Sequence, residues 1–207
     1  MQASASRAQR RIWAPYTLLA AFAVIVCLWR LPGRYGAGEE LEADVHPNEA
    51  LLEGFYQGFR WRDAEAMASC YAANATFSDP VFQGLKGLEV PAMWRMLTGR
   101  ARDLTVTYHG VKADDTRGQA DWEATYSYGP ARRRVHNVIH STFRFKDGKI
   151  VAQRDKFNLW RWSRMALGTR GALLGWFPPV RSAIRREARK GLDAYMQAQS
   201  QTQSARA

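Results

Sequence analysis

The second half of the chain holds four consecutive stretches with the pattern of β-strands, each separated from the next by turn residues such as Asp147-Gly148. The stretches are residues 104–113, 119–128, 133–146 and 149–159. Apolar side chains that recur with a period of two are typical of strands with one buried face, and short turns join antiparallel neighbours. The pattern therefore predicts a four-stranded antiparallel meander.

Three stretches with apolar residues at helical spacing precede this meander. The first starts near Leu51, the second runs from Ala64 to Tyr71, and the third runs from Leu88 to Gly99. Helices followed by a run of strands are typical of an α+β domain. A chain of 207 residues that is 46% hydrophobic is long enough and apolar enough for one domain with a sizeable core.

Asp79 is the first candidate for chemistry, because it lies among apolar residues directly before Pro80. If Phe77, Val81 and Phe82 build a cavity, the carboxylate between them is partly desolvated. Desolvation raises the pKa of a carboxyl group and makes it a better base. An Asp before a proline also commonly starts a turn, in which its side chain accepts local backbone hydrogen bonds. The sequence leaves both interpretations open.

The segment from Leu51 to Pro80 contains an Arg62-Asp63 turn, a helix that ends in Tyr71-Ala72, and the motif Ala-Thr-x-x-Asp-Pro at residues 75–80. With these features it resembles the opening of the nuclear transport factor 2-like superfamily, and in particular ketosteroid isomerase. It implies a cone-shaped, curved antiparallel sheet wrapped around N-terminal helices, with a pocket between them. It also implies a general base at Asp79, whereas the position of the isomerase's oxyanion-hole tyrosine holds Phe55.

A second block, Asp147 to Phe157, resembles the last strand of SnoaL-like polyketide cyclases and of limonene epoxide hydrolase. The pocket carboxylate of those relatives falls on Asp155. The hydrolase's companion Arg-x-Asp falls near residues 121–123, where no arginine is present. The two resemblances cover residues 47–159 and imply an apolar small-molecule ligand, with Asp79 as base and Asp155 as a second acid or base. Isomerase, cyclase and epoxide hydrolase chemistry all fit, and a non-catalytic ligand-binding or protein-interaction module is the alternative.

Alternation predicts which strand side chains face the pocket. In residues 133–146 the inner face holds Asn137, Ser141 and Phe143, so His136 and His140 point outward unless a bulge before Phe143 turns His140 inward. In residues 119–128 the apolar face holds Trp122, Ala124, Tyr126 and Tyr128. The same rule turns Asp121 and Glu123 away from the pocket. The predicted ligand-binding residues are Phe55, Tyr71, Phe77, Phe82, Trp94, Asn137, Ser141, Phe143 and Phe157.

The net charge of +11 is concentrated at the C-terminus, where residues 160–207 hold nine basic and two acidic side chains. A basic tail favours nucleic acid or an anionic membrane as partner. The tryptophans at its start favour the membrane, and no nucleic-acid recognition motif is present. After Pro178-Pro179 an amphipathic basic helix is predicted, with Val180, Ile184 and Leu192 on one face. It lies either on a bilayer or against the outer face of the sheet.

The run from Ile12 to Trp29 contains 18 residues without a charge and is flanked by arginines. As a helix it spans about 27 Å, close to the hydrocarbon thickness of a bilayer. It predicts a single N-terminal membrane span of undetermined side, with a cleaved signal peptide and a soluble cytoplasmic domain as alternatives. The predicted organisation is an anchor at 1–31, a linker at 32–46, the SnoaL-like domain at 47–159 and a basic amphipathic extension at 160–207.

The sequence contains no pattern that indicates a metal or cofactor site. Cys27 and Cys70 lie in different environments, which predicts no disulfide, and two cysteines are too few for a thiolate zinc site. The four histidines lack metal-ligand spacing, and no glycine-rich phosphate loop is present. We therefore expect neither a metal nor a cofactor. The resemblance implies a possible homodimer through the outer face of the sheet.

Overall fold

The computed structural model describes residues 45–205 of the chain. The predicted membrane anchor at residues 1–31 and most of the predicted linker lie outside this range. Within residues 45–205, none of the helices combines the length and the apolar character that crossing a bilayer requires.

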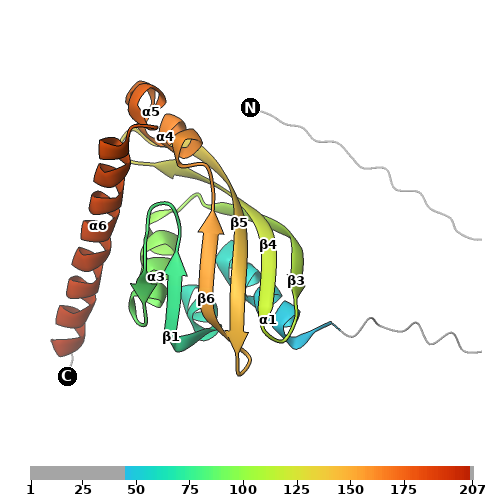
Figure 1. Cartoon of the computed structure of the whole chain (residues 1–207). Coiled ribbons are helices and arrows are strands. Elements are labelled where there is room, and N and C mark those ends of the chain that lie inside the picture. Colours follow the sequence, from blue (N-terminus) through green and yellow to red (C-terminus); the bar gives the residue numbers. More distant parts are fainter. Residues whose placement is uncertain (1–44, 206–207) are drawn as a thin grey trace, which may run out of the picture. The chain divides into compact units, whose positions relative to one another are not determined.

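Six strands form one curved sheet in the order β2-β1-β6-β5-β4-β3, and α1 and α3 pack against its inner face (Figure 1). The strands are β1 (Tyr71–Ser78), β2 (Leu85–Lys86), β3 (Thr105–Ala113), β4 (Arg117–Tyr128), β5 (Arg133–Lys146) and β6 (Lys149–Lys156). The helices are α1 (Pro47–Trp61), α2 (Ala64–Ser69), α3 (Glu89–Arg100), α4 (Leu159–Leu167), α5 (Thr169–Leu174) and α6 (Pro178–Ser204). The α+β class and the meander β3–β6 were predicted. The sheet as a whole is mixed, because β1 runs parallel to β6.

The helix α1 ends and the helix α2 begins at the predicted Arg62-Asp63 turn. Arg62 adopts a left-handed conformation that ends α1, and the side chain of Asp63 accepts hydrogen bonds from the first backbone amides of α2. The prediction that α2 runs on through Tyr71 was wrong. Tyr71 begins β1, where it pairs with Ile150 of β6 and buries its ring in the core. Tertiary packing of this aromatic residue outweighs its local helical pattern.

The alternation rule correctly assigned the two faces of the central strands. Ile139, Ser141 and Phe143 of β5 are buried, and the inner face of β4 carries buried Trp122 and Ala124.

The outer face pairs the histidines with acids of the neighbouring strand. His140 Nδ1 lies 2.7 Å from Asp121 Oδ1, and His136 Nε2 lies 2.6 Å from Glu123 Oε2. The bulge that would have turned His140 inward is absent from this strand pair, which stays in register from Arg117 to Tyr128.

The last strand is shorter than predicted, and a helical segment replaces its end. The strand β6 stops at Lys156, and the side chain of Asn158 accepts a hydrogen bond of 2.9 Å from the backbone amide of Arg161. This is an N-cap, which satisfies a backbone donor at the start of α4. Leu159 therefore begins a helix instead of ending a strand.

The long C-terminal helix α6 belongs to the same core as the rest of the domain. Leu192 is fully buried, Arg185 Nε donates a 3.0 Å hydrogen bond to the carbonyl oxygen of Pro80, and Arg189 pairs with Glu89 at the start of α3. The apolar face of α6 therefore packs beside α3 (Figure 1). This differs from both predicted locations, a bilayer surface and the outer face of the sheet.

Removing residues 1–44 is expected to leave the domain folded. The main core is built from residues between Leu52 and Leu192, with peripheral contributions from Leu51, Tyr195 and Met196. In thermal unfolding followed by circular dichroism, the truncated chain should melt cooperatively within about 5 °C of the full chain, a shift that corresponds to roughly 1 kcal/mol or less. Loss of a cooperative transition would show that the missing segment is part of the fold.

Candidate active site

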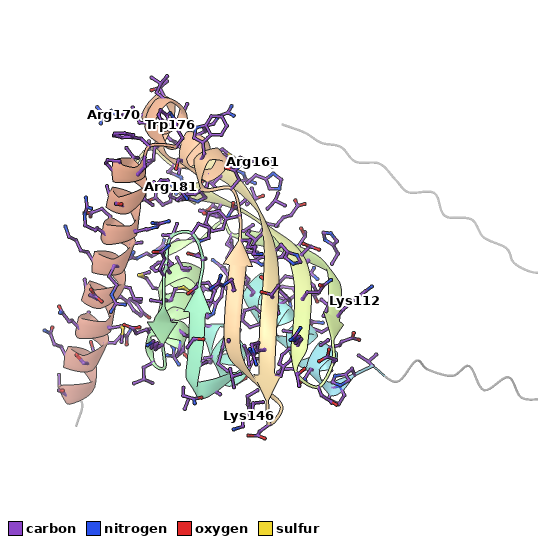
Figure 2. The ribbon with its side chains drawn as sticks, viewed as in Figure 1. Lys112, Lys146, Arg161, Arg170, Trp176 and Arg181 are labelled. Atoms are coloured by element: carbon purple, nitrogen blue, oxygen red, sulfur yellow. The ribbon has the colours of Figure 1, made fainter. Side chains whose placement is uncertain are left out.

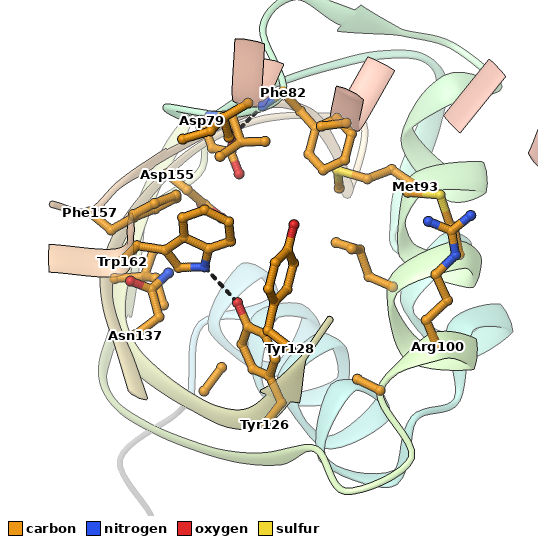
Figure 3. Close-up of a pocket in the computed structure, with 18 of the residues that line it drawn as sticks. Asp79, Phe82, Met93, Arg100, Tyr126, Tyr128, Asn137, Asp155, Phe157 and Trp162 are labelled. Atoms are coloured by element: carbon orange, nitrogen blue, oxygen red, sulfur yellow. Dashed lines mark hydrogen bonds between the residues drawn. The ribbon is translucent and has the colours of Figure 1, made fainter. Parts of the chain in front are cut away.

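A cavity of about 510 Å³ lies between the inner face of the sheet and the helices α3, α4 and α6. Cavities of this size hold small-molecule ligands in many proteins. Its wall is mostly apolar, and carbon-rich side chains surround the open space in Figure 3. The wall includes Phe77, Phe82, Met93, Trp94, Ile139, Phe157 and Ile184.

Asp79 lies at the end of β1 with one carboxylate oxygen used by a turn and the other directed toward the cavity (Figure 3). Its Oδ1 accepts a 2.6 Å hydrogen bond from the backbone amide of Val81 and a second from that of Phe82. Burial raises the pKa of Asp79 to about 6, although these amides and nearby Arg185 favour the charged form. Asp79 is therefore both a turn residue and a desolvated carboxyl group, because the turn positions its side chain.

Asp155 is the second carboxyl group of the cavity, and it is 4% exposed. Its Oδ1 accepts hydrogen bonds from Ser141 Oγ at 2.6 Å and from Gln153 Nε2 at 2.9 Å. The pKa of Asp155 is raised to about 7, chiefly by burial and in the same direction by the negative charge of Asp79, while the two donors act against this rise. The protonated form of Asp155 is therefore favoured at much higher pH than that of an exposed aspartate.

A chain of buried hydrogen bonds fixes Asp155 from behind. Ser141 accepts a 2.8 Å hydrogen bond from Trp122 Nε1. On the other side, Tyr71 donates its hydroxyl hydrogen to Gln153 Oε1 and accepts a 2.9 Å bond from Trp94 Nε1. Because two donors converge on Asp155 Oδ1 and are themselves held by Trp122 and Tyr71, this chain fixes the orientation of the carboxyl group.

The two carboxyl groups interact electrostatically. Figure 3 shows Asp79 and Asp155 on the same side of the cavity, and the charge of Asp79 contributes to the raised pKa of Asp155. Two carboxylates that share a site with little water resist being ionised together. The arrangement therefore favours one proton on the pair near neutral pH.

Comparison with known proteins identifies the fold of the domain that contains Asp79 and Asp155. The family model described as "SnoaL-like domain" matches residues 52–153. This part of the chain is a SnoaL-like domain. The match includes β1, which leads to Asp79, and ends two residues before Asp155.

Solved structures share the fold of the SnoaL-like domain at low sequence identity. An LEH-like epoxide hydrolase of M. tuberculosis is 20% identical, with 64% of this chain and 96% of that chain covered and a TM-score of 0.50. Bal32a, from a soil-derived mobile gene cassette, is 21% identical, with 58% and 96% covered and a TM-score of 0.52. An NTF2-like protein of unknown function from Burkholderia pseudomallei is 13% identical, with 59% and 98% covered and a TM-score of 0.51. No curated protein matches the chain.

Seven of the eleven predicted site residues line the cavity of the SnoaL-like domain, and four do not. Those that line it are Asp79, Asp155, Phe77, Phe82, Trp94, Asn137 and Phe157. Tyr71 and Ser141 lie behind the wall as members of the hydrogen-bond chain to Asp155. Phe55 and Phe143 pack in the core, where their rings meet edge to face at 6.4 Å between centroids.

Several residues around the cavity were missed by the sequence interpretation. Gln153 precedes Asp155 by two positions on β6, so the alternation rule places both on one face and could have identified it. The contributions of α4 and α6 had no such signal. Trp162 of α4 donates a 2.9 Å hydrogen bond to the hydroxyl of Tyr126, which joins the helix to the sheet across one side of the cavity (Figure 3).

Neither acid of the Asp121 to Glu123 segment reaches the cavity, since both point outward to histidines. The position that the epoxide hydrolase resemblance assigned to a companion acid is therefore on the opposite face of the sheet. Within residues 45–205, no cluster of three or more His, Cys, Asp and Glu side chains is placed to hold a metal ion.

Proposed function

We propose that the SnoaL-like domain binds an apolar small molecule in its cavity and transfers protons to and from it. The observation that carries this proposal is the pair of carboxyl groups, Asp79 and Asp155, with raised pKa values of about 6 and about 7 in an otherwise apolar cavity. A general acid or base works best when its pKa lies near the working pH. A membrane partner and a homodimer remain additional proposals that rest on the sequence.

Asp79 is assigned the role of base, because its pKa is the lower of the two. The singly protonated pair then has a carboxylate at Asp79 and a carboxylic acid at Asp155. Two carboxyl groups whose environments separate their pKa values are a common arrangement for acid and base roles. Asn137, which lines the same cavity, is proposed to orient a polar group of the ligand.

One reaction that fits is isomerisation of an unsaturated ketone. Asp79 removes a proton from the carbon next to the carbonyl, and the electron pair of that C–H bond forms the enol C=C bond. Asp155 gives its proton to the carbonyl oxygen, so charge does not accumulate in the apolar cavity. Return of a proton to a different carbon, with loss of the enol proton to Asp155, completes the isomerisation and restores both groups.

Opening of an epoxide by water fits the same pair. Asp79 takes a proton from water as the water oxygen attacks an epoxide carbon, and the C–O bond breaks as Asp155 protonates the leaving oxygen. The product is a diol, and transfer of the proton from Asp79 to Asp155 restores the starting state. The M. tuberculosis structure is named an epoxide hydrolase, which makes epoxides a reasonable first substrate class to test.

A non-catalytic ligand-binding domain is the second candidate. Phe55 has no hydroxyl and is buried in the core, so the isomerase's oxyanion donor is missing at that position. One oxygen of Asp79 is also occupied by the turn to Phe82. In this case the cavity would bind an apolar molecule without converting it.

Assays of proton transfer separate these two candidates. The protein is incubated in D₂O with an enolisable β,γ-unsaturated ketone, and in H₂¹⁸O with small apolar epoxides, and products are followed by mass spectrometry. The proposal expects deuterium exchange or diol formation that depends on the protein. Binding of these compounds without any exchange or diol formation would support the non-catalytic candidate.

A larger side chain on α6 that fills part of the cavity is expected to block ligand binding. Ala183 lines the cavity, so Ala183→Trp should weaken binding of the neutral probe N-phenyl-1-naphthylamine by about tenfold or more, equivalent to roughly 1.4 kcal/mol. Ala194 lies on the exposed side of the same helix, and Ala194→Trp is the control with the same added volume. Equal binding by both variants would show that the probe does not enter this cavity.

A further inference from the structure

The end of the molecule formed by α4, α5 and the start of α6, residues 159–181, exposes large apolar side chains. Leu173 is 72% exposed, Trp176 is 63% exposed and Phe177 is 44% exposed. The rings of Trp176 and Phe177 are in contact, with centroids 5.8 Å apart. Adjacent exposed apolar groups of this size mark surfaces that bind a partner or a membrane. We call residues 159–181 the arginine-aromatic tip.

The tip carries only positive charge. Arg161, Arg164, Arg170 and Arg181 are exposed, and the sequence has no acidic residue between Lys156 and Arg186. None of these four guanidinium groups forms a salt bridge within residues 45–205. Figure 2 shows Arg161, Arg170, Arg181 and Trp176 gathered at this end of the molecule. The apolar side chains are therefore flanked by cations without counter-charges.

Close packing between α4 and α5 builds the tip. A Cβ on Gly171 would lie 1.9 Å from the carbonyl oxygen of Ser163, and one on Gly175 would lie 2.7 Å from Ser163 Cβ. Trp160 Nε1 donates a 3.1 Å hydrogen bond to the carbonyl oxygen of Ala172. The two helices thus contact each other through glycines, which directs Leu173 and Trp176 outward.

We propose that the arginine-aromatic tip docks on the surface of an anionic lipid bilayer. Tryptophan and phenylalanine insert at the interfacial level of a bilayer, while arginines extend to the lipid phosphates. This assigns the membrane contact to α4, α5 and the connection from α5 to the start of α6, since the apolar face of α6 is buried inside the domain. A symmetric contact between two copies would place arginines against arginines, which is unfavourable. Exposed Leu173 and Leu174 add nothing to nucleic-acid binding, which relies on basic and stacking side chains.

The docking is tested on the full chain with an environment-sensitive fluorophore introduced as a noncanonical amino acid at position 173 or at position 88. Leu88 is the matched control, because it is 77% exposed and precedes α3, outside the tip. Vesicles contain either phosphatidylcholine alone or phosphatidylcholine with phosphatidylglycerol. We expect a blue shift at position 173 with anionic vesicles, and no shift at position 88. Contacts of residues 1–44 with lipid are common to both labelled proteins, so a shift at position 173 without one at position 88 reports on the tip itself.

Charge reversal tests the arginines. For the double variant Arg161→Glu/Arg170→Glu, we expect that about tenfold or more lipid is needed to reach the same blue shift at position 173. The reason is that each basic residue near an anionic surface contributes to binding. Lys112→Glu/Lys146→Glu changes the net charge equally at exposed positions outside the tip and should leave the response unchanged. Circular dichroism verifies that each variant is folded.

Three results would overturn the proposal. The first is an unshifted fluorophore at position 173 with anionic vesicles. The second is a shift without vesicles that grows with protein concentration, which indicates contact between copies. The third is a shift with duplex DNA or RNA in place of lipid, which indicates a nucleic-acid surface. The test does not depend on the chemistry proposed for the cavity, since no substrate is present.

Discussion

Asp79→Asn is expected to slow turnover of any substrate that the domain converts by about 10²-fold to 10⁴-fold, the usual contribution of a general base. The asparagine oxygen can still accept the hydrogen bonds from Val81 and Phe82, so the turn after β1 is kept. What is lost is the negative charge that removes a proton. The rate of deuterium exchange or diol formation measures the loss, and affinity for a neutral apolar probe should change little.

The control for this substitution is Asp114→Asn. Asp114 Oδ1 also accepts two backbone hydrogen bonds, each 2.7 Å long, from Thr116 and Arg117, but it lies in an exposed turn outside the apolar cavity. This variant should keep full activity. If Asp79→Asn turns over substrate as fast as the control, Asp79 has no role in the mechanism and acts only in the turn.

Asp155 is expected to make the domain less stable as the pH rises. Its pKa is about 7 in the folded protein and about 3.9 in the unfolded chain. Folding therefore favours the protonated form, so its full contribution is present below about pH 4 and is lost as the pH rises through 7. The free energy of unfolding should fall by up to about 4 kcal/mol from this group between pH 4 and pH 8.

Urea unfolding of Asp155→Asn isolates this contribution. The variant has no titrating group at this position, so wild type should lose stability relative to Asp155→Asn as the pH is raised from 4 to 8. Asp147→Asn, at an exposed left-handed position of the β5–β6 turn, is the control and should follow wild type. Parallel pH profiles for wild type and both variants would mean that Asp155 titrates as an exposed carboxyl group does.

The sequence was most informative where one periodicity dominates a long element. Alternation along β4 and β5 correctly placed Asn137 and Trp122 inward and both histidines outward, because a one-residue shift would move every apolar side chain into water. Apolar neighbours pointed to Asp79, whereas Asp155, between Arg154 and Lys156, was suggested only by the resemblance to SnoaL-like cyclases and limonene epoxide hydrolase.

Depth within the core could not be predicted in the same way. Phe55 and Phe143 have the apolar character of a pocket wall, yet they lie one layer behind it. Which aromatic residue reaches the cavity depends on how α1 and α3 sit against the sheet, and this is a property of the assembled fold. The position of α6 was missed for the same reason, because an amphipathic helix shows that one face is covered without showing what covers it.

Titration of the two carboxyl groups tests the central claim most directly. Side-chain ¹³C NMR resonances of Asp79 and Asp155 are followed from pH 3 to pH 9 in wild type and in Asp79→Asn. We expect transitions near pH 6 and pH 7 in wild type, and a lower pKa for Asp155 in the variant, because the charge of Asp79 raises it. Two transitions near pH 4, the value of an unperturbed aspartate, would contradict the proposal of a coupled acid–base pair in this cavity.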